Sequence, residues 1–319
     1  MSLVCRVCHS QGNHPRYTVR EQMFGWGDKF EYFRCEGCGC VQIAHVPQDL
    51  ARFYPRNYYS FNMAPVPQQG LKSWMAGLRD SWAATGSGVL GRLLHHVKEA
   101  TLDVRSLGGI PARKDMRILD VGCGRGVLLS ALSRAGVGQL EGVDPYLSDD
   151  VQVLPGLRVS KKELDQVTGE YDLIMLHHVF EHLEFAGQLL TAGRQKLAKK
   201  GKILLRFPTP ESEAWERYRE NWVQWDAPRH LFLHTRKSVG ILAEQAGLKI
   251  EKCWCDSFAF QFWGSELYTR GLSLEGNATS EEVRKRFSAK QMKSFARESE
   301  KLNASGRGDQ LVVILGHPN

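Results

Sequence analysis

Two pairs of cysteines near the start of the chain carry the first recognisable chemistry. Cys5 and Cys8 form one Cys-x-x-Cys pair, and Cys35 and Cys38 form a second. Four thiolates from two such pairs can close a tetrahedral zinc site that has no open position. We therefore expect a structural zinc ion, which supplies much of the stability of a module too small to have a core of its own.

The sequence also allows alternatives to a zinc site with four cysteine ligands. His9 and His14 are candidate substitute ligands, and a redox role for the thiols is the alternative to a metal. The remaining thiols show no pattern typical of a nucleophile or a ligand, and we expect them to be bystanders: Cys40, Cys123, Cys253 and Cys255.

A glycine-rich turn, Asp120-Val121-Gly122-Cys123-Gly124-Arg125-Gly126, follows a short apolar run. Glycines at the end of a first strand let a ligand approach the backbone closely, and the next helix points its free N–H groups at that ligand. The spacing is Gly-x-Gly-x-Gly, which differs from the dinucleotide pattern. Asp144 lies about 20 residues further on, where a carboxylate accepts hydrogen bonds from ribose hydroxyls.

Histidines gather in two segments that both follow predicted strands. His177, His178 and His182 lie after the fourth strand, and His230 lies after the fifth, at the edge where ligands of open α/β sheets bind. A histidine titrates near neutrality and suits a general base. We rank His230 first as the catalytic base, then His182 and His178; a purely structural role is the alternative for each.

Arg229 precedes His230 and can clamp a phosphate or carboxylate with its planar guanidinium. A salt bridge to Asp226 or Glu220 is the alternative. Trp222 and Trp225 either line the substrate pocket or pack in the core.

From residue 117 the apolar pattern alternates between strands and helices, which predicts a doubly wound parallel sheet. The predicted strands are 117–121, 140–143, 157–159, 171–176, 203–207, 248–254 and 311–315. The predicted helices are 127–135, 183–197 with Gly201 as its cap, 235–246 and a charged stretch ending near 302. Before them, Trp74, Leu78 and Trp82 form a helical stripe, and a second helix is expected over 93–104.

The chain of 319 residues is long enough for about two domains. We predict a zinc-ribbon domain over 1–45, an aromatic and helical bridge over 46–110 and a ligand-binding domain over 111–319. The composition, 42% hydrophobic and 24% charged, excludes a mainly disordered chain. No apolar run reaches the roughly 20 residues of a membrane span. We expect no secretory leader and a cytoplasmic location.

The glycine turn with Asp120, Asp144 and the strand over 171–176 resembles the class I S-adenosylmethionine-dependent methyltransferases. The resemblance implies a seven-stranded Rossmann-like sheet whose last strand is antiparallel, and S-adenosylmethionine as cofactor. It places the methionine part beside Asp120, Gly122, Cys123, Gly124 and Gly126, and the ribose on Asp144. It also sets His177 and His178 beside the ligand, and the adenine near Glu163 or Leu164. A nicotinamide-dependent Rossmann enzyme is the alternative.

The cysteine ribbon, Phe53-Tyr54-Pro55, Tyr58-Tyr59-Ser60 and Pro228-Arg229-His230-Leu231 together resemble bacterial methyltransferases of sugar and polysaccharide pathways. This implies a small acceptor such as a sugar, a nucleotide-sugar or a glycan. A related branch of zinc-containing sugar C-methyltransferases has Glu-His where this chain has Arg229-His230. The departure leaves methylation of an oxygen at least as well supported as methylation of a carbon.

The net charge of +7 is compatible with a nucleic-acid partner, and some RNA methyltransferases also carry an N-terminal zinc ribbon. The basic residues are dispersed among acids, which favours an anionic small molecule instead. A non-enzymatic scaffold with a degenerate cofactor site is the third hypothesis. The acceptor, the methylated atom and the oligomeric state stay open.

Overall fold

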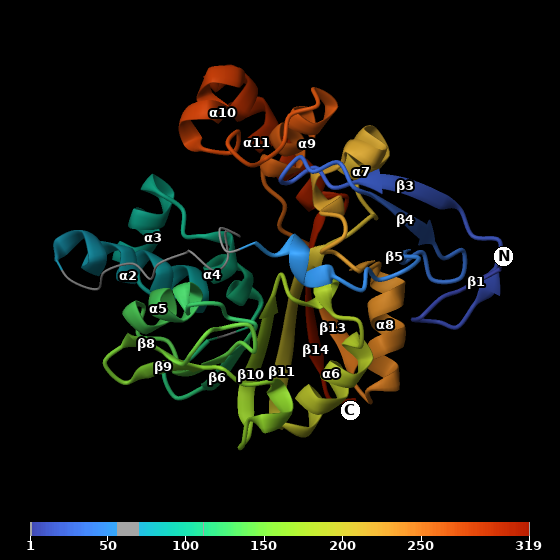
Figure 1. The fold of residues 1–319 in the computed structure, drawn as a ribbon. Coiled ribbons are helices and arrows are strands. Elements are labelled where there is room, and N and C mark those ends of the chain that lie inside the picture. The colour runs from blue at the N-terminus through green and yellow to red at the C-terminus, as the bar shows by residue number, and fades with distance from the viewer. Residues whose placement is uncertain (1, 56–69, 111, 319) are drawn as a thin grey trace.

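The centre of the molecule is an eight-stranded sheet in the order β13-β14-β11-β10-β6-β7-β9-β8 (Figure 1). The structure is a computed structural model that describes residues 2–55, 70–110 and 112–318. The predicted motif Tyr58-Tyr59-Ser60 lies outside them. The strands are β6 (Arg117–Val121), β7 (Gln139–Val143), β8 (Val151–Leu154), β9 (Leu157–Ser160), β10 (Tyr171–His177), β11 (Leu197–Pro208), β13 (Lys249–Cys255) and β14 (Gln310–Gly316).

The sheet confirms the predicted doubly wound architecture. Strands β9, β7, β6, β10 and β11 are parallel, and β14 runs antiparallel to both β11 and β13. The eighth strand, β8, was not expected. It forms a hairpin with β9 at the edge of the sheet, and its four half-exposed residues carry too weak a pattern to predict a strand.

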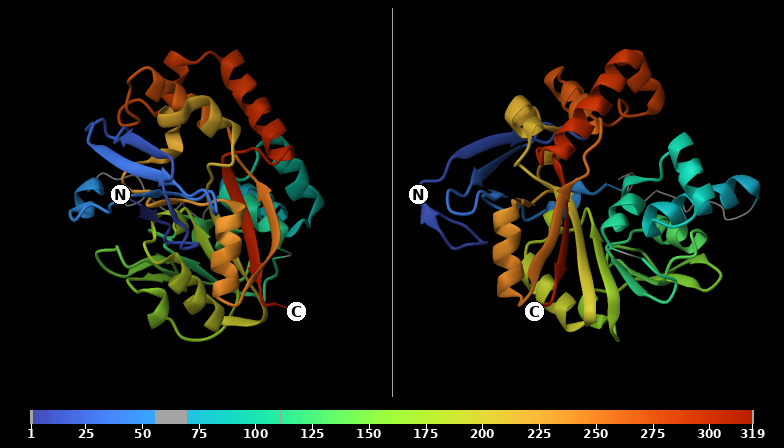
Figure 2. Two further views of the ribbon diagram at one scale, coloured as in Figure 1. Left: turned by 90° about the vertical axis from the view of Figure 1, so that its right-hand side faces the viewer. Right: turned by 180° about the vertical axis from the view of Figure 1, so that it is seen from behind.

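Helices cover both faces of the sheet (Figures 1 and 2). One face carries α2 (Leu71–Thr85), α4 (Leu102–Ser106) and α5 (Val127–Arg134), and the other carries α6 (Ala186–Gln195) and α8 (Arg236–Gln245). Because both faces are buried, central strand residues such as Leu173 and Ile174 are fully inaccessible to solvent. Beyond the carboxyl edge lie α7 (Glu213–Tyr218), α9 (Phe260–Thr269), α10 (Ser280–Arg286) and α11 (Ala289–Ala304).

Two predicted helices have different bounds. The helix expected over 93–104 is two helices, α3 (Val89–Val97) and α4, and a Cβ atom at Gly91 would lie 2.3 Å from the Leu78 carbonyl oxygen, so the glycine lets α3 pack closely on α2. The helix expected over 183–197 begins at Ala186. Gly201 does not cap it, because the residue lies inside β11.

The N-terminal strands form a sheet with a strand from the far half of the chain. β3 (Arg16–Arg20), β4 (Lys29–Arg34) and β5 (Val41–Ile43) are antiparallel, and β12 (Phe232–Leu233) pairs with β5 as the fourth strand. A short pair, β1 (Leu3–Val4) and β2 (Gln11–Gly12), stands beside them. The boundary predicted at residue 45 therefore separates segments that share one sheet.

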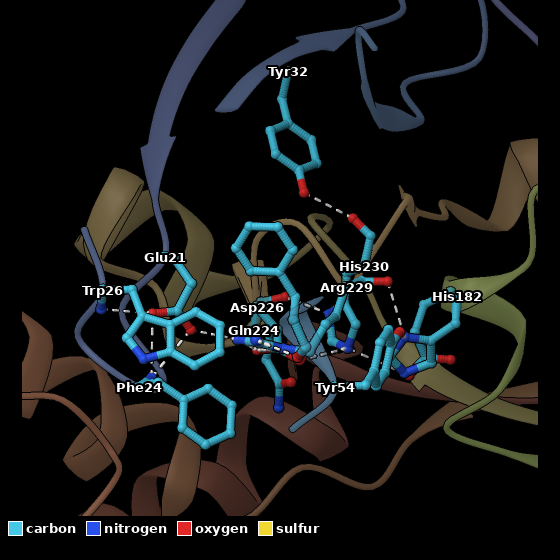
Figure 3. A network of polar contacts seen from close by, with 12 residues as sticks. Glu21, Phe24, Trp26, Tyr32, Tyr54, His182, Gln224, Asp226, Arg229 and His230 are labelled. Atoms are coloured by element: carbon cyan, nitrogen blue, oxygen red, sulfur yellow. Dashed lines mark hydrogen bonds and ion pairs between the residues drawn. The ribbon is translucent and has the colours of Figure 1, made fainter. Parts of the chain in front are cut away.

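Arg229 joins the N-terminal strands to the segment before β12 (Figure 3). Its side chain is fully buried, and Nη2 lies 2.7 Å from Glu21, whose side chain is also fully buried. Nε donates to Asp226 at 2.9 Å, and Nη1 donates to the Phe53 carbonyl at 3.0 Å. The predicted clamp for an anionic substrate is therefore wrong, because the guanidinium is occupied inside the protein; the salt bridge to Asp226 is confirmed.

We expect Glu21→Ala to lower the free energy of unfolding by about 3–5 kcal/mol, because it leaves a buried guanidinium with one carboxylate fewer. Urea unfolding monitored by tryptophan fluorescence measures the change. Glu31→Ala is the control, because the exposed Glu31 carboxylate accepts a hydrogen bond from Thr18 and has no buried charge to compensate, so its effect should stay within about 0.5 kcal/mol. Equal effects of the two substitutions would contradict this account of the interface.

Candidate functional site

The glycine turn lies at the carboxyl end of β6, where only glycine fits the backbone. Gly122, Gly124 and Gly126 all have positive φ, at 70°, 53° and 78°. A Cβ atom at Gly122 would also lie 2.5 Å from Cγ2 of Val179, so the loop after β10 touches this turn. The Cys123 side chain packs toward β7, with Sγ 2.7 Å from where a Cβ of Gly142 would be. The backbone N–H of Cys123 donates to the Val143 carbonyl, and its carbonyl accepts from the Gly126 N–H.

Two carboxyl groups flank the turn. Asp144 accepts the Gly124 N–H at 2.9 Å with one oxygen and the Tyr146 N–H at 2.9 Å with the other. Each oxygen keeps a further lone pair for a ribose hydroxyl. Burial, together with the charges of Asp103 and Asp144, raises the pKa of Asp120 well above its ordinary value. Asp120 thus holds its proton to higher pH than an exposed aspartate does.

The bridge helix α4 reaches the end of β10. Asp103 lies 3.2 Å from Nη1 of the buried Arg206 and 3.8 Å from Nδ1 of His177. Arg206 also donates to Asp256 at 2.6 Å. The ring nitrogens of His177 are buried without a hydrogen-bond partner, and burial lowers its pKa to about 4. His177 is therefore a neutral imidazole at the place predicted for the cofactor.

His178 begins the loop after β10 in a strained conformation. Its φ is +54°, which is rare outside glycine and is typical of functional sites. Nδ1 lies 3.3 Å from Oε1 of Glu181, and Nε2 accepts from Arg206. The His178 side chain is about one-third exposed, so it stands at the mouth of the site rather than inside it.

His182 and His230 meet edge to face, with ring centroids 4.8 Å apart (Figure 3). Nδ1 of His182 lies 2.9 Å from the Arg229 carbonyl, and Nδ1 of His230 lies 2.8 Å from the Gln224 carbonyl. A carbonyl only accepts, so we assign the hydrogen of both rings to Nδ1. Nε2 is then the atom of each ring that takes up or releases a second proton, as a general base requires.

Glu181 faces these imidazoles and was not predicted as a site residue. The carboxylate is fully buried, and its Oε1 lies 3.3 Å from Nδ1 of His178 and 4.0 Å from Nε2 of His230. Burial opposes its ionisation, but His178, His182 and His230 outweigh burial and lower the pKa of Glu181 to about 2. The signal in the sequence that could have identified Glu181 is its position three residues after His178. Glu181, His182 and His230 also offer ligand atoms within 4.8 Å of one another.

Other predicted site residues lie apart from this cluster. Trp222 and Trp225 are buried and pack against Trp215, so they are core residues rather than pocket walls. Glu163 is exposed and Leu164 is buried in the core. The adenine contact near them stays a prediction.

The four paired cysteines come together as predicted. The sulfur atoms of Cys5 and Cys38 are 3.7 Å apart and those of Cys8 and Cys35 are 3.5 Å apart, and all four lie within 4.8 Å. Zn–S bonds of about 2.3 Å in a tetrahedron require sulfurs about 3.8 Å apart. The cluster therefore fits a structural zinc ion. Neither His9 nor His14 belongs to the cluster, and the His14 ring stacks on Phe33.

The Cys5 and Cys38 sulfurs share a hydrogen bond, and this interaction outweighs burial and lowers the pKa of Cys5 to about 4. Burial, by contrast, raises the pKa of Cys40, whose sulfur lies 3.8 Å from Nδ1 of His234. Only a thiolate binds a metal. Cys40 is thus a buried neutral thiol outside the cluster, as expected of a bystander.

A family model described as a methyltransferase domain matches residues 93–252, half of the chain. The mitochondrial ubiquinone biosynthesis O-methyltransferase of Saccharomyces cerevisiae is 28% identical over 115 residues; the match covers 32% of this chain and 37% of that protein. The chain thus spans little more than a third of that relative's length.

Two solved structures are similar to this chain at low identity. The mycolic acid cyclopropane synthase CmaA1, complexed with SAH and CTAB, is 18% identical, and the match covers 70% of this chain and 85% of that one with a TM-score of 0.43. A SAM-dependent methyltransferase from Archaeoglobus fulgidus is 22% identical, and the match covers 71% and 99% of the two chains with a TM-score of 0.42.

We expect the purified protein to hold one zinc ion per chain and Cys5→Ser to hold none, because three thiolates leave the tetrahedron open. Metal analysis by mass spectrometry measures the content. Cys40→Ser is the matched control, since it removes a buried thiol outside the cluster and should keep the metal. Full zinc content in Cys5→Ser would show that the zinc is held elsewhere.

Three buried histidines should make the protein sensitive to mild acid. Burial lowers the pKa of His177 and His182 to about 4 and that of His234 to about 3. In the unfolded chain each titrates near pH 6.5, so between about pH 6.5 and 4 the unfolded state binds more protons. We expect the free energy of unfolding to decrease as the pH is lowered through this window. The three histidines together contribute up to about 4 kcal/mol per pH unit.

Urea unfolding at intervals between neutral pH and pH 5 measures this slope. His234→Phe is the test variant, because the ring packs among Phe180, Phe207 and Phe232 and an apolar ring fits there. The variant should lose about one third of the slope, since one of three uncharged imidazoles is gone. An unchanged slope would mean that His234 is protonated in the folded state.

Proposed function

The chain belongs to the methyltransferase domain family and is an S-adenosylmethionine-dependent methyltransferase; from this premise we propose that it methylates a hydroxyl of a small polar acceptor, a sugar, nucleotide-sugar or glycan, with His230 as the base. One observation carries the proposal. Nε2 of His230 lies 4.0 Å from the carboxylate of Glu181, on the loop that touches the glycine turn.

The residues of the carboxyl edge fit S-adenosylmethionine. The three glycines leave room for the methionine part, Asp144 has lone pairs for the ribose hydroxyls, and His177 borders the same turn as a neutral ring. When bound there, S-adenosylmethionine supplies a methyl group on a positively charged sulfur. Asp120 and His177 lie at this edge, and the buried Arg206 beside them is held by Asp103 and Asp256.

His230 acts as the base in this proposal. Its Nδ1–H is held by the Gln224 carbonyl, so Nε2 is free to take the proton of an acceptor hydroxyl while the oxygen is methylated. The imidazolium that results lies 4.0 Å from Glu181 and 3.8 Å from Asp226, and these carboxylates stabilise its charge. His182, whose Nε2 is also unprotonated, orients the hydroxyl by accepting or sharing its hydrogen bond.

The charges of the site favour a neutral reacting group. Glu181 is the carboxylate at its centre, and the Arg229 guanidinium is already paired with Glu21 and Asp226. A phosphate beside the reacting atom would meet this negative charge. We therefore propose that the methylated part is a neutral sugar hydroxyl, and that any phosphate of a nucleotide-sugar lies away from the histidines.

The N-terminal strands support a small acceptor over RNA. Their sheet is closed by β12, and Glu21 and the Tyr32 hydroxyl bind residues next to the histidine cluster. The zinc-ribbon module is thus engaged in shaping the site from within the chain, whereas an RNA-binding module needs a free, basic face.

We expect His230→Gln to lower kcat by about 10²–10⁴-fold, because the amide cannot take the proton, while the affinity for S-adenosylmethionine stays within about twofold. Asp144→Ala should weaken the binding of S-adenosylmethionine, since it removes the carboxylate that accepts hydrogen bonds from the ribose hydroxyls. Isothermal titration with the cofactor and transfer of labelled methyl to a panel of nucleotide-sugars, free sugars and RNA measure both. Methyl transfer to RNA alone would refute the acceptor class, and full turnover in His230→Gln would refute the base.

A further inference from the structure

Exposed apolar side chains are concentrated on helices α2 and α3. Among the residues that the structure describes, twelve large hydrophobic side chains are exposed, and seven of them lie on these two helices. They are Leu71, Trp74, Met75, Val89, Leu90, Leu93 and Val97, and they include the most exposed of the set, Val97 at 87%. Surface patches of this kind mark interaction sites.

The two helices stand at the end of the molecule opposite the N-terminal strands (Figures 1 and 2). α2 buries Ser73, Gly77, Asp80 and Ala84 against the body, and α3 lies on the outer side of α2, with Gly91 in contact with Leu78. The buried face of α3 therefore packs against α2. Its apolar outer residues have no role in the core.

The exposed charges between residues 71 and 98 are all positive. Lys72, Arg92 and Lys98 are exposed, and His96 is exposed beside them. The one acidic residue of this stretch, Asp80, is buried and pairs with Arg79 and Arg134. The exposed Glu99 follows Lys98 and pairs with Arg105. Most of the exposed charges that border this apolar surface are therefore cationic, and they complement a surface with an apolar interior and anionic headgroups.

We propose that α2 and α3 bind the surface of an anionic phospholipid bilayer, with the helices in the plane of the interface. Leu90, Leu93 and Val97 enter the acyl boundary, Trp74 lies at the headgroup level, and Arg92 and Lys98 contact the phosphates. The attachment is peripheral, since no described helix is long and apolar enough to cross a membrane. The inference does not depend on the acceptor proposed above.

Sedimentation of the full-length protein with vesicles tests the proposal. We expect binding to vesicles of phosphatidylcholine with phosphatidylglycerol, and binding at least about tenfold weaker to phosphatidylcholine alone. Leu93→Ser combined with Val97→Ser should abolish binding, and Arg92→Gln combined with Lys98→Gln should weaken it by about fivefold for each charge removed. These side chains are exposed, and an unchanged thermal midpoint verifies that the variants fold.

Two control variants make the same kinds of substitution outside α2 and α3. Lys199→Gln with Lys200→Gln removes two exposed charges from β11, and Phe258→Ser removes an exposed apolar side chain, 44% accessible, before α9. Both should bind vesicles like the unaltered protein. The proposal is overturned if the protein does not bind anionic vesicles, or if the β11 control loses as much affinity. It is also overturned if Leu93 and Val97 change only the protein's self-association, which would make this face a contact between copies.

Discussion

The buried ion pair of Arg229 and Glu21 is the interaction on which the site depends. Two charges removed from water are costly unless each is fully paired, and here Glu21, Asp226 and the Phe53 carbonyl surround one guanidinium. The same residue's carbonyl holds Nδ1 of His182. The N-terminal strands, the bridge and the histidine cluster therefore depend on the same residue for their positions, and the loss of Arg229 would disturb all three.

The parts of the site that a short motif specifies could be predicted from the sequence. Positive φ at Gly122, Gly124 and Gly126 is a demand on the backbone that only glycine meets cheaply, so the spacing indicates the turn. Asp144 follows at the end of the next strand of the sheet, where topology brings it to the turn. The cysteine pairs are predictable for the same reason, because a tetrahedron of sulfurs needs two tight knuckles.

Features that depend on distant partners could not be predicted. Arg229 has the chemistry of an anion clamp, and only the arrival of Glu21, 208 residues earlier in the chain, turns it into a structural residue. Glu181 was not predicted as a site residue, because a carboxylate early in a helical turn usually has a local partner. Its place in the site depends on His230, which lies on another loop. The pairing of β12 with β5 escaped prediction because a two-residue strand has almost no pattern of its own.

That pairing also sets an order of events during synthesis. Gln42 pairs with Phe232, so the first sheet of the chain stays open until the ribosome has passed residue 233. At about 5–20 residues per second this takes on the order of ten to forty seconds. During this interval β5 is an unpaired edge, which is a hazard for aggregation, while the cysteine knuckles are already complete. The four paired cysteines are thus all synthesised before the sheet can close, so the proposed zinc site is complete in sequence before its module is complete in structure.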